Sequence, residues 1–375
     1  MTHSSTPDCL VLGGGLAGAM AALRLAASGR ITVLVEKEKA AHHKVCGEFL
    51  SPEAVSYLHQ SGVDPIELGA APIQTLRLSA GDRIVETKLP FTALSLSRHI
   101  LDEALLSRAE EEGCIVRRGI AIDKLANSGQ NSGQYWISQL STGESISAPA
   151  VFLATGKHDL RGWSRPRGVQ SDLVGFKLHW RLAPSQTAAL GNAMDLFLFR
   201  GGYGGLSLVE NQIANLCLVV RKPVLRKLGG WPTLLSAILA ENRRVRHFLG
   251  DAQPLWHRPL AVSTIPYGHL GSQFSSPTLW PLGDQIAVIP SFTGDGMSIA
   301  LHSAALATAA HLASASAPDY QRQLVSQLRS GMSLATALSR AIVHPIPRQA
   351  IPFALSVFPQ LMSWIASATR IQTPS

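Results

Sequence analysis

Apolar residues near the N-terminus follow the pattern of a strand, a helix and a second strand. Cys9–Leu12 is a short apolar run, residues 20–27 are rich in strong helix formers, and residues 31–35 form a second apolar run. A strand, a helix and a strand in this order form the repeating unit of a parallel sheet. The pattern therefore predicts a parallel α/β domain at this end of the chain.

The same strand and helix periods return further along the chain. Apolar residues at helical spacing predict a helix over residues 96–113, which Gly113 ends, and a strand from Val116 onward. Residues 279–289 contain two short apolar runs, and residues 296–313 again have helical spacing. We expect these segments to extend the N-terminal α/β domain.

Two other segments have extended, strand-like patterns without helical spacing, and we predict that they are insertions. Residues 75–96 contain two extended runs around a turn signal at residues 80–82, which predicts a hairpin. Residues 174–265 contain alternating or β-rich runs joined by turns, which predicts an antiparallel sheet.

A glycine-rich turn lies between the first predicted strand and the first predicted helix. The six residues from Gly13 to Gly18 fit the G-x-G-x-x-G pattern, in which the glycines permit a tight turn, backbone approach to a pyrophosphate and close helix–strand packing. Glu36 ends the second strand, eighteen residues beyond Gly18, where a carboxylate can accept the hydroxyls of an adenosine ribose. This motif predicts a bound dinucleotide. Its predicted contacts are Gly13, Gly15, Leu16, Ala17, Gly18, Glu36 and Lys37.

A second motif indicates which dinucleotide binds. Leu282-Gly283-Asp284 is followed by Pro290 and by a turn at residues 294–297 before a predicted helix. This pairing resembles the second FAD signature of flavin enzymes related to para-hydroxybenzoate hydroxylase. The resemblance implies that Asp284 binds the ribityl chain and that the turn aims a helix N-terminus at the flavin, where its dipole stabilises negative charge on the reduced ring. The predicted contacts are Gly283, Asp284, Pro290, Gly294, Asp295, Gly296 and Met297.

Two shorter segments extend this resemblance, which covers residues 9 to about 303. Arg98 resembles the arginine of the family that reaches the FAD pyrophosphate. Ala154, Thr155 and Gly156 match a strand end that packs near the adenosine half of FAD. The chain departs from many aromatic hydroxylases after this strand, where Gly156-Lys157-His158-Asp159 replaces an Asp-Gly pair.

The loop around Cys46 carries another resemblance. Lys44-Val45-Cys46-Gly47 is similar to the Lys-x-Cys-Gly stretch of geranylgeranyl reductases, which implies that Lys44, Cys46 and Gly47 lie beside the flavin and makes Cys46 a candidate catalytic residue. A small apolar cysteine that fills a packed loop is the alternative. The Tyr-x-Trp-x-Phe-Pro pattern of those reductases and the Trp-x-Trp-x-Ile-Pro segment of flavin halogenases are both absent from the sequence.

We therefore expect an α/β fold: a Rossmann-like FAD/NAD(P)-binding domain with an inserted antiparallel β-sheet substrate domain and C-terminal helices. The FAD-binding domain is predicted over residues 1–74, 97–165 and 266–340, the substrate domain over residues 75–96 and 166–265, and a C-terminal helical segment over residues 341–375. A substrate pocket is predicted between the flavin and the sheet. Its predicted lining is Phe176, His179, Trp180, Phe197, Tyr203 and Leu206.

The composition and charge of the chain limit the classes of binding partner that we expect. The formal charge is +8, but the 33 Lys and Arg residues are scattered, so we predict no nucleic-acid partner. The four cysteines lie far apart without a CxxC pair, which predicts neither a disulfide framework nor a metal site and favours a cytoplasmic protein. Residues 349–369 are uncharged and apolar, but Pro352 and Pro359 argue against a membrane-spanning helix. Buried terminal helices, or peripheral membrane contact, are the expectations for this segment.

The functional hypothesis is a single-component FAD-dependent monooxygenase that hydroxylates or epoxidises a lipophilic, polyketide- or isoprenoid-like metabolite. The alternatives are a reductase or dehydrogenase of carbon–carbon bonds, and an electron-transfer flavoprotein at a membrane surface. No second glycine fingerprint is present, so NAD(P)H is expected to act as a transient electron donor, with a protein donor as the alternative.

Overall fold

The apolar strands near the N-terminus assemble into a five-stranded parallel sheet in the computed structural model, which describes residues 6–128, 135–344 and 367–370. Alternate residues of the first strand serve two cores, because Cys9 and Val11 pack with helices on one face while Leu10 and Leu12 pack with Trp136 on the other. The strands, in spatial order, are β18 (Leu279–Pro281), β10 (Ala150–Leu153), β1 (Cys9–Leu12), β2 (Thr32–Glu36) and β6 (Ile115–Arg118).

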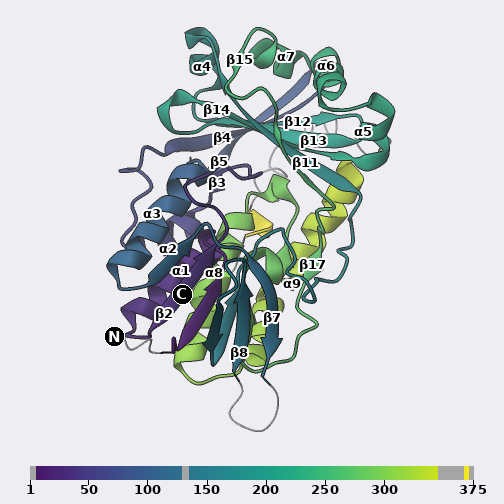
Figure 1. Cartoon of the computed structure of the whole chain (residues 1–375). Helices are drawn as coiled ribbons and strands as arrows, with labels where there is room; N and C mark the ends of the chain where they lie inside the picture. The colour runs from purple at the N-terminus through teal and green to yellow at the C-terminus, as the bar shows by residue number, and fades with distance from the viewer. Residues whose placement is uncertain (1–5, 129–134, 345–366, 371–375) are drawn as a thin grey trace.

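The two faces of this sheet are covered differently (Figure 1). One face packs on helices, which are α1 (Leu16–Ala27), α3 (Arg98–Glu111) and α8 (Gly296–Leu312), with α2 (Pro52–Gln60) against α8. The other face packs on a small antiparallel sheet of β7 (Ile122–Asn127), β8 (Trp136–Leu140) and β9 (Ser145–Ala148). This arrangement places the glycine turn between β1 and α1 at the carboxyl ends of the parallel strands, where ligands of open α/β sheets bind.

A nine-stranded sheet forms the other half of the molecule and is built from three separate chain segments. Its neighbours are antiparallel except where β4 pairs with β12 in parallel, from Thr75 opposite Ala193 to Ala80 opposite Leu198. In spatial order the strands are β15 (Gln253–Pro254), β11 (Leu173–Arg181), β14 (Ala214–Arg221), β13 (Gly202–Leu208), β12 (Ala193–Phe199), β4 (Ala71–Ala80), β5 (Arg83–Ser95) and β3 (Phe49–Leu50), with β16 (Leu260–Ser263) also on β11.

Helices cover the outer face of this second sheet, which the strand-rich pattern of residues 174–265 did not predict. Pro223 and Pro232 lie in the first turns of two of them, where proline is tolerated, and the Asn242 side chain caps a third by accepting from the backbone of Arg244 and Val245. These helices are α4 (Pro184–Leu190), α5 (Lys222–Leu228), α6 (Trp231–Glu241) and α7 (Arg243–Leu249).

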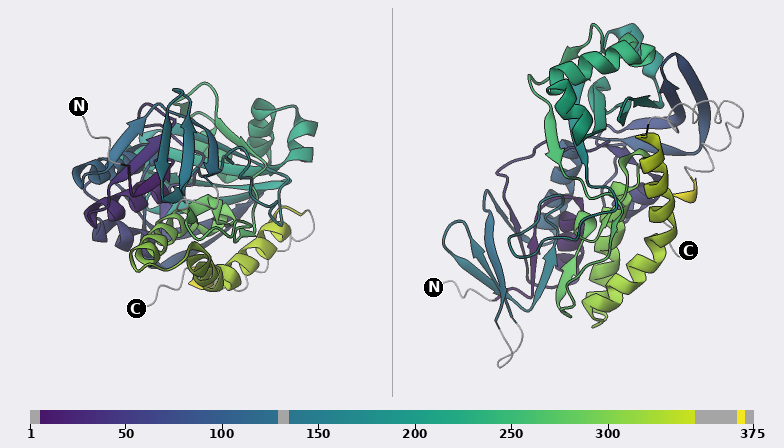
Figure 2. Two further views of the ribbon diagram at one scale, coloured as in Figure 1. Left: turned by 60° about the horizontal axis from the view of Figure 1, so that its bottom comes forward. Right: turned by 90° about the vertical axis from the view of Figure 1, so that its right-hand side faces the viewer.

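A 26-residue helix, α9 (Ala317–Ile342), runs along the parallel-sheet half toward the second sheet (Figure 2). It begins with a capping box, in which Ser316 and Asp319 satisfy each other's backbone N–H groups. A two-stranded ladder of β17 (His269–Leu270) and β19 (Ala287–Val288) lies beside it.

These elements confirm the predicted α/β fold class with its parallel core, antiparallel strands and C-terminal helices, whereas the exact domain boundaries stay a prediction. Within the described ranges, no helix is long and apolar enough to cross a membrane. The uncharged stretch at residues 349–369 lies almost entirely outside the described residues, and with it the predicted membrane contact of the 341–375 segment.

Candidate functional site

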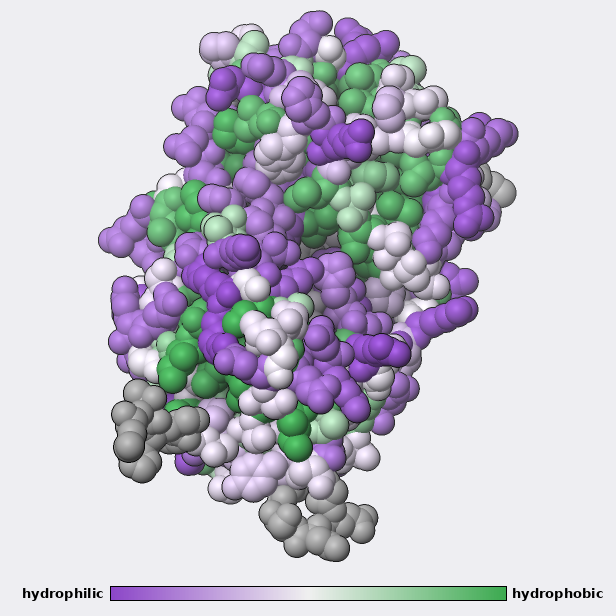
Figure 3. All heavy atoms as spheres, viewed as in Figure 1, coloured by the Kyte–Doolittle hydropathy of each residue, from purple (hydrophilic) through white to green (hydrophobic). Residues whose placement is uncertain are grey.

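A cavity of about 770 Å³ lies between the parallel-sheet half and the inner face of the second sheet. One end is lined by the β1–α1 glycine turn, the loop of residues 42–48 and the end of β10, and the other end by β4, β12, β13, β14 and the last turns of α9. On the molecular surface, apolar side chains gather around a hollow between the two halves (Figure 3). Of the predicted cofactor contacts, all line this cavity except Gly18, Pro290 and Asp295.

The glycine turn brings three backbone segments together more closely than side chains allow. Gly13 has φ +108°, and a Cβ added to it would lie 2.5 Å from the carbonyl oxygen of Ala154. A Cβ added to Gly18 would lie 1.9 Å from the carbonyl oxygen of Gly13. Gly15 has open space on its cavity side, bounded by the cationic nitrogens of Arg98 and Lys44, each 3.4 Å from an added Cβ. A helix N-terminus with two facing cations is suited to a pyrophosphate.

Glu36 is held at the end of β2 by backbone donors. Its carboxylate accepts from the N–H of Gly14 at 2.5 Å and from the N–H of Glu38 at 3.0 Å, and the side chain is buried. An ionised carboxylate has about four lone-pair sites, so acceptor capacity remains for ribose hydroxyls. The residues at this end of the cavity thus fit the adenosine half of FAD.

Asp102, which sequence reasoning did not single out, positions both cavity cations. Its oxygens accept from Arg98 Nε at 2.6 Å, Arg98 Nη2 at 2.9 Å and Lys44 Nζ at 2.8 Å. Burial opposes ionisation of Asp102, but Arg98 and Lys44 outweigh it and hold the pKa of the carboxyl below its usual range. The i,i+4 spacing of Arg98 and Asp102 on α3 was the available signal.

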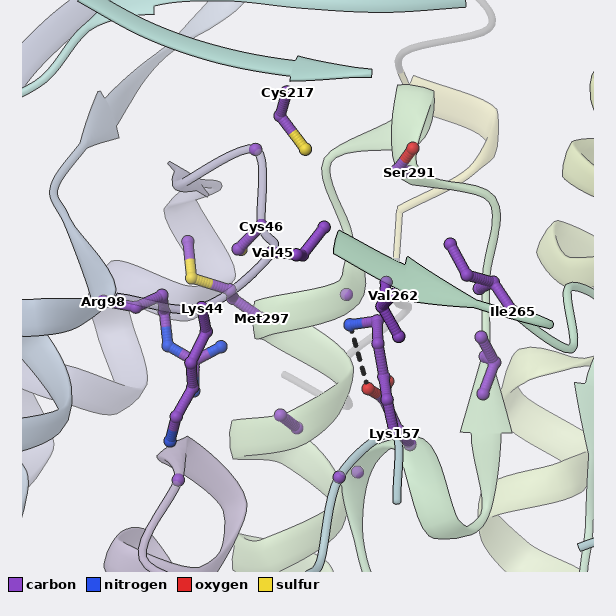
Figure 4. Close-up of a pocket in the computed structure, with 18 of the residues that line it drawn as sticks. Lys44, Val45, Cys46, Arg98, Lys157, Cys217, Val262, Ile265, Ser291 and Met297 are labelled. Carbon is purple, nitrogen blue, oxygen red and sulfur yellow. Dashed lines mark ion pairs between the residues drawn. The ribbon is translucent and has the colours of Figure 1, made fainter. Parts of the chain in front are cut away.

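Lys157, which lies where the chain departs from many aromatic hydroxylases, forms an ion pair with Asp284. Lys157 Nζ lies 3.2 Å from Asp284 Oδ2, and this ion pair faces the cavity opposite Lys44 and Arg98 (Figure 4). Arg165 holds both partners in place, because it donates to the carbonyl oxygens of Asp284 at 2.7 Å and Lys157 at 2.9 Å and to Asp159 Oδ1 at 2.6 Å. Asp284 raises the pKa of Lys157 above its usual value. The loop after β10 therefore presents a fixed cation in place of the hydroxylase Asp-Gly pair.

The turn before α8 contacts the cavity through its glycines rather than through Asp295. Gly294 has φ +77°, and an added Cβ would lie 2.5 Å from the Phe49 ring. Asp295 is fully buried and accepts from Arg370 Nη1 at 2.8 Å. Burial raises the pKa of Asp295 to about 7, against the opposing effect of Arg370. The predicted contacts Gly294, Gly296 and Met297 line the cavity, and Asp295 instead ties this turn to the C-terminal part of the chain.

The Cys46 loop is fixed to the second sheet by a buried charge cluster. Asn215 Nδ2 donates to the carbonyl oxygens of Cys46 at 3.3 Å and Gly47 at 3.1 Å. Glu48 follows with φ +59°, fully buried, and its carboxylate contacts Lys177 Nζ and lies 3.0 Å from His179 Nε2. Burial opposes ionisation of Glu48, but Lys177 and His179 keep its pKa below the usual range. Lys177 and His179, two polar residues inside the apolar part of strand β11, were the signal for this cluster.

The same cluster offers nitrogen and oxygen ligands. Ligand atoms of His43, Glu48 and His179 all lie within 4.8 Å of one another. Burial, reinforced by Lys177 and His179, lowers the pKa of His43 to about 4, so its ring is neutral. Lys177 already neutralises the carboxylate on one oxygen, and a metal cation would have to compete with that ammonium. The geometry favours an ion-pair anchor for the loop.

The predicted substrate lining needs correction. Tyr203 lines the cavity, but Phe176, Trp180, Phe197 and Leu206 pack against the helices on the outer face, and His179 contacts Glu48 instead. Both faces of these strands are apolar, so period-two alternation does not tell the inner face from the outer one. The side chains that form the inner apolar wall are Leu76, Leu78, Leu89, Met194, Leu196, Leu198 and Val219.

Comparison with known proteins agrees with this geometry. Residues 6–157 match the family model of the FAD binding domain. The chain is 24% identical over 354 residues to the menaquinone reductase of Mycolicibacterium smegmatis, covering 90% of this chain and 85% of the relative.

Two solved structures show the same fold. A flavoprotein/dehydrogenase from Cytophaga hutchinsonii superimposes with a TM-score of 0.77 at 18% identity over 96% of this chain and 92% of its own. The Pseudomonas aeruginosa protein pqsL, a probable FAD-dependent monooxygenase, superimposes with a TM-score of 0.70 at 19% identity over 93% of this chain and 100% of its own. The chain thus shares its fold with these flavoproteins, and residues 6–157 match the FAD binding domain model.

Proposed function

We propose that the protein is an FAD-dependent monooxygenase that acts on a lipophilic, polyketide- or isoprenoid-like small molecule. The observation that carries the proposal is the continuity of one cavity, which joins the charged glycine-turn end to an apolar wall of leucine, methionine and valine side chains. A ligand held against that wall has the flavin end of the same cavity within reach.

The cationic end of the cavity is suited to hold FAD. In this proposal Arg98 and Lys44, which border the glycine turn, bind the pyrophosphate, Glu36 binds the ribose, and Asp284 binds the ribityl chain, as the resemblance implies. Bound FAD would transfer electrons and, with oxygen gas, supply the oxygen atom that enters the product. Electrons are proposed to come from NAD(P)H, which binds transiently.

The apolar end contributes positioning and exclusion of water. Its titratable side chains are held neutral, since burial raises the pKa values of Tyr203 and Tyr267 and raises that of Cys217 to about 12. Oxygenation at the flavin requires little acid–base catalysis from the protein. An apolar wall that excludes water would protect the reactive oxygen species from reaction with water. This environment therefore favours oxygenation.

Reduction of a carbon–carbon double bond is the second candidate. Its support is the similarity to the menaquinone reductase over 90% of this chain, together with the Cys46 loop that lines the cavity. Both reactions use the same cofactor and the same apolar wall, and they differ in whether oxygen enters the product.

Isotope labelling separates the two reactions. The FAD-loaded protein is reduced anaerobically with NADPH or NADH, and 4-nonylphenol or a short-chain menaquinone is added before ¹⁸O₂ is admitted. A product heavier by one ¹⁸O atom supports monooxygenation. A menaquinone product that is formed without oxygen and stays heavier by two hydrogens after its ring is re-oxidised to the quinone supports the reductase. Reduction of the flavin without conversion of either probe would count against both and favour an electron-transfer role.

A further inference from the structure

Three hydroxyl groups meet inside the otherwise apolar part of the cavity. They belong to Tyr203 at the start of β13, Tyr267 before β17, and Ser291 in the turn that precedes Gly294, and we name them the hydroxyl cluster. Tyr203 Oη lies 3.3 Å from Ser291 Oγ, and Tyr267 lines the same part of the cavity. Both tyrosines are 3% exposed, and all three residues line the cavity.

The hydroxyl cluster is a neutral polar spot in apolar surroundings. Tyr203 packs edge-to-face on Phe292 with ring centroids 5.8 Å apart, and Ile265 and Val288 belong to the same core. Burial raises the pKa of both tyrosines, so both hydroxyls are neutral. The cluster is therefore suited to an uncharged polar group, and it is separate from the cations that face the pyrophosphate position.

Counting donors and acceptors indicates which polar group fits. Tyr203 Oη and Ser291 Oγ share one hydrogen bond at 3.3 Å, in which either hydroxyl can donate. Three hydroxyl groups carry three protons and about six lone-pair sites, so acceptor sites outnumber donors in the cluster. A ligand that donates a hydrogen bond is the better match.

The position of the cluster relates it to the reaction. Ser291 lies three residues before Gly294, in the turn that the family resemblance aims at the flavin, and on the other side of the cavity from Lys44 and Arg98 (Figure 4). The apolar wall of β4 and β12 continues from it. A molecule whose hydroxyl group reaches the cluster can lay an apolar chain along that wall.

We propose that Tyr203, Tyr267 and Ser291 select the substrate, by accepting a ring hydroxyl of a phenol- or hydroquinone-type molecule whose apolar chain lies on the β4–β12 wall. This assignment rests on the proposed function only in placing that ring beside the flavin. Tyr203, Tyr267 and Ser291 are binding and specificity residues in this proposal.

Binding of a matched pair of probes tests it without turnover. The FAD-loaded protein is titrated with 4-nonylphenol and with nonylbenzene, which differ by one hydroxyl, and the flavin absorbance change gives each Kd. The wild type is expected to bind the phenol roughly tenfold more tightly, as one to two hydrogen bonds predict. Tyr203→Phe and Ser291→Ala should each reduce that preference to about twofold and leave the Kd of nonylbenzene within about twofold of the wild-type value.

The control is Tyr57→Phe, which removes a hydrogen-bonded tyrosine hydroxyl that lies outside the cavity, 2.6 Å from His302 Nδ1. This variant should retain the full preference for the phenol. Equal affinity of the wild type for both probes would overturn the proposal, and so would a parallel loss of both affinities in Tyr203→Phe. Tight phenol binding without any conversion would count against the proposed oxygenation and leave the hydroxyl cluster's role intact.

Discussion

Replacing Lys177 by methionine removes one charge of a fully buried ion pair while nearly keeping its volume. Lys177 and Glu48 are both 0% exposed, and loss of one partner of such a pair costs about 3–5 kcal/mol. His179 and the Arg98 backbone N–H still contact the Glu48 carboxylate, at 3.0 and 2.8 Å, so we expect the lower end, about 3 kcal/mol. An unfolding entropy of about 0.8 kcal/mol/K for a chain of 375 residues converts this loss into a Tm decrease of about 4 °C.

The loss should depend on pH with a defined sign. In the wild type the folded-state pKa of Glu48 is below its unfolded value, so this carboxyl stabilises the fold above the unfolded pKa of about 4.3 and loses that contribution as pH falls through the folded pKa. Without Lys177 the pKa of Glu48 rises, and a protonated Glu48 needs no counter-ion. The Tm difference between Lys177→Met and the wild type should therefore be larger at pH 8 than at pH 5.

Differential scanning calorimetry of the FAD-loaded proteins at these two pH values measures the effect. Lys222→Met is the matched control, because Lys222 Nζ donates to the neutral Thr264 hydroxyl at 2.7 Å outside the buried cluster, and its Tm should change by less than about 1 °C. A Tm decrease below about 1 °C for Lys177→Met at pH 8, or an equal decrease at both pH values, would refute the ion-pair reasoning.

Three further substitutions test the cofactor end of the cavity. Gly18→Ala should leave less than about a tenth of the wild-type flavin bound after purification, because its Cβ would lie 1.9 Å from the Gly13 carbonyl oxygen. A variant that keeps the wild-type amount of bound flavin would disprove this packing. Asp102→Asn should raise the Kd for FAD roughly tenfold in a fluorescence titration of the apoprotein, since both cavity cations lose their charged partner, and an unchanged Kd would contradict that role. Arg165→Met should weaken FAD binding several-fold in the same titration, because it releases the loop that carries Lys157. Arg161 is exposed, and Arg161→Met should bind FAD like the wild type. Equal effects of the two substitutions would argue against Arg165 as the anchor of this loop.

The cofactor end of the cavity could be predicted because its signals are local. The strand–turn–helix context of residues 9–27 and Glu36 at the end of β2 are each readable within one βαβ unit. The fold class followed from the same periodicities. The helices α4 to α7 were missed because short helices between strand-rich segments have few residues to establish a helical period.

The substrate end could not be predicted in the same way, because its details depend on tertiary packing. Phe197 and Leu196 are adjacent apolar residues of β12, and only the position of the covering helices decides that Leu196 faces the cavity. The i,i+4 spacing of Arg98 and Asp102 and the polar residues of β11 are visible in the sequence, but the partners Lys44 and Glu48 lie 58 and 129 positions away and are brought together only by the fold.

The parallel pairing of β4 with β12 has a consequence for synthesis. The β4–β5 hairpin is complete at Ser95, but the strand that covers its open edge begins only at Ala193, nearly 100 residues later. At about 5–20 residues per second, a ribosome needs about 5–20 s to supply that strand. During this interval the nascent chain carries an unpaired β-edge with the apolar Leu76 and Leu78 beside it, which is a template for intermolecular association and a natural binding site for chaperones.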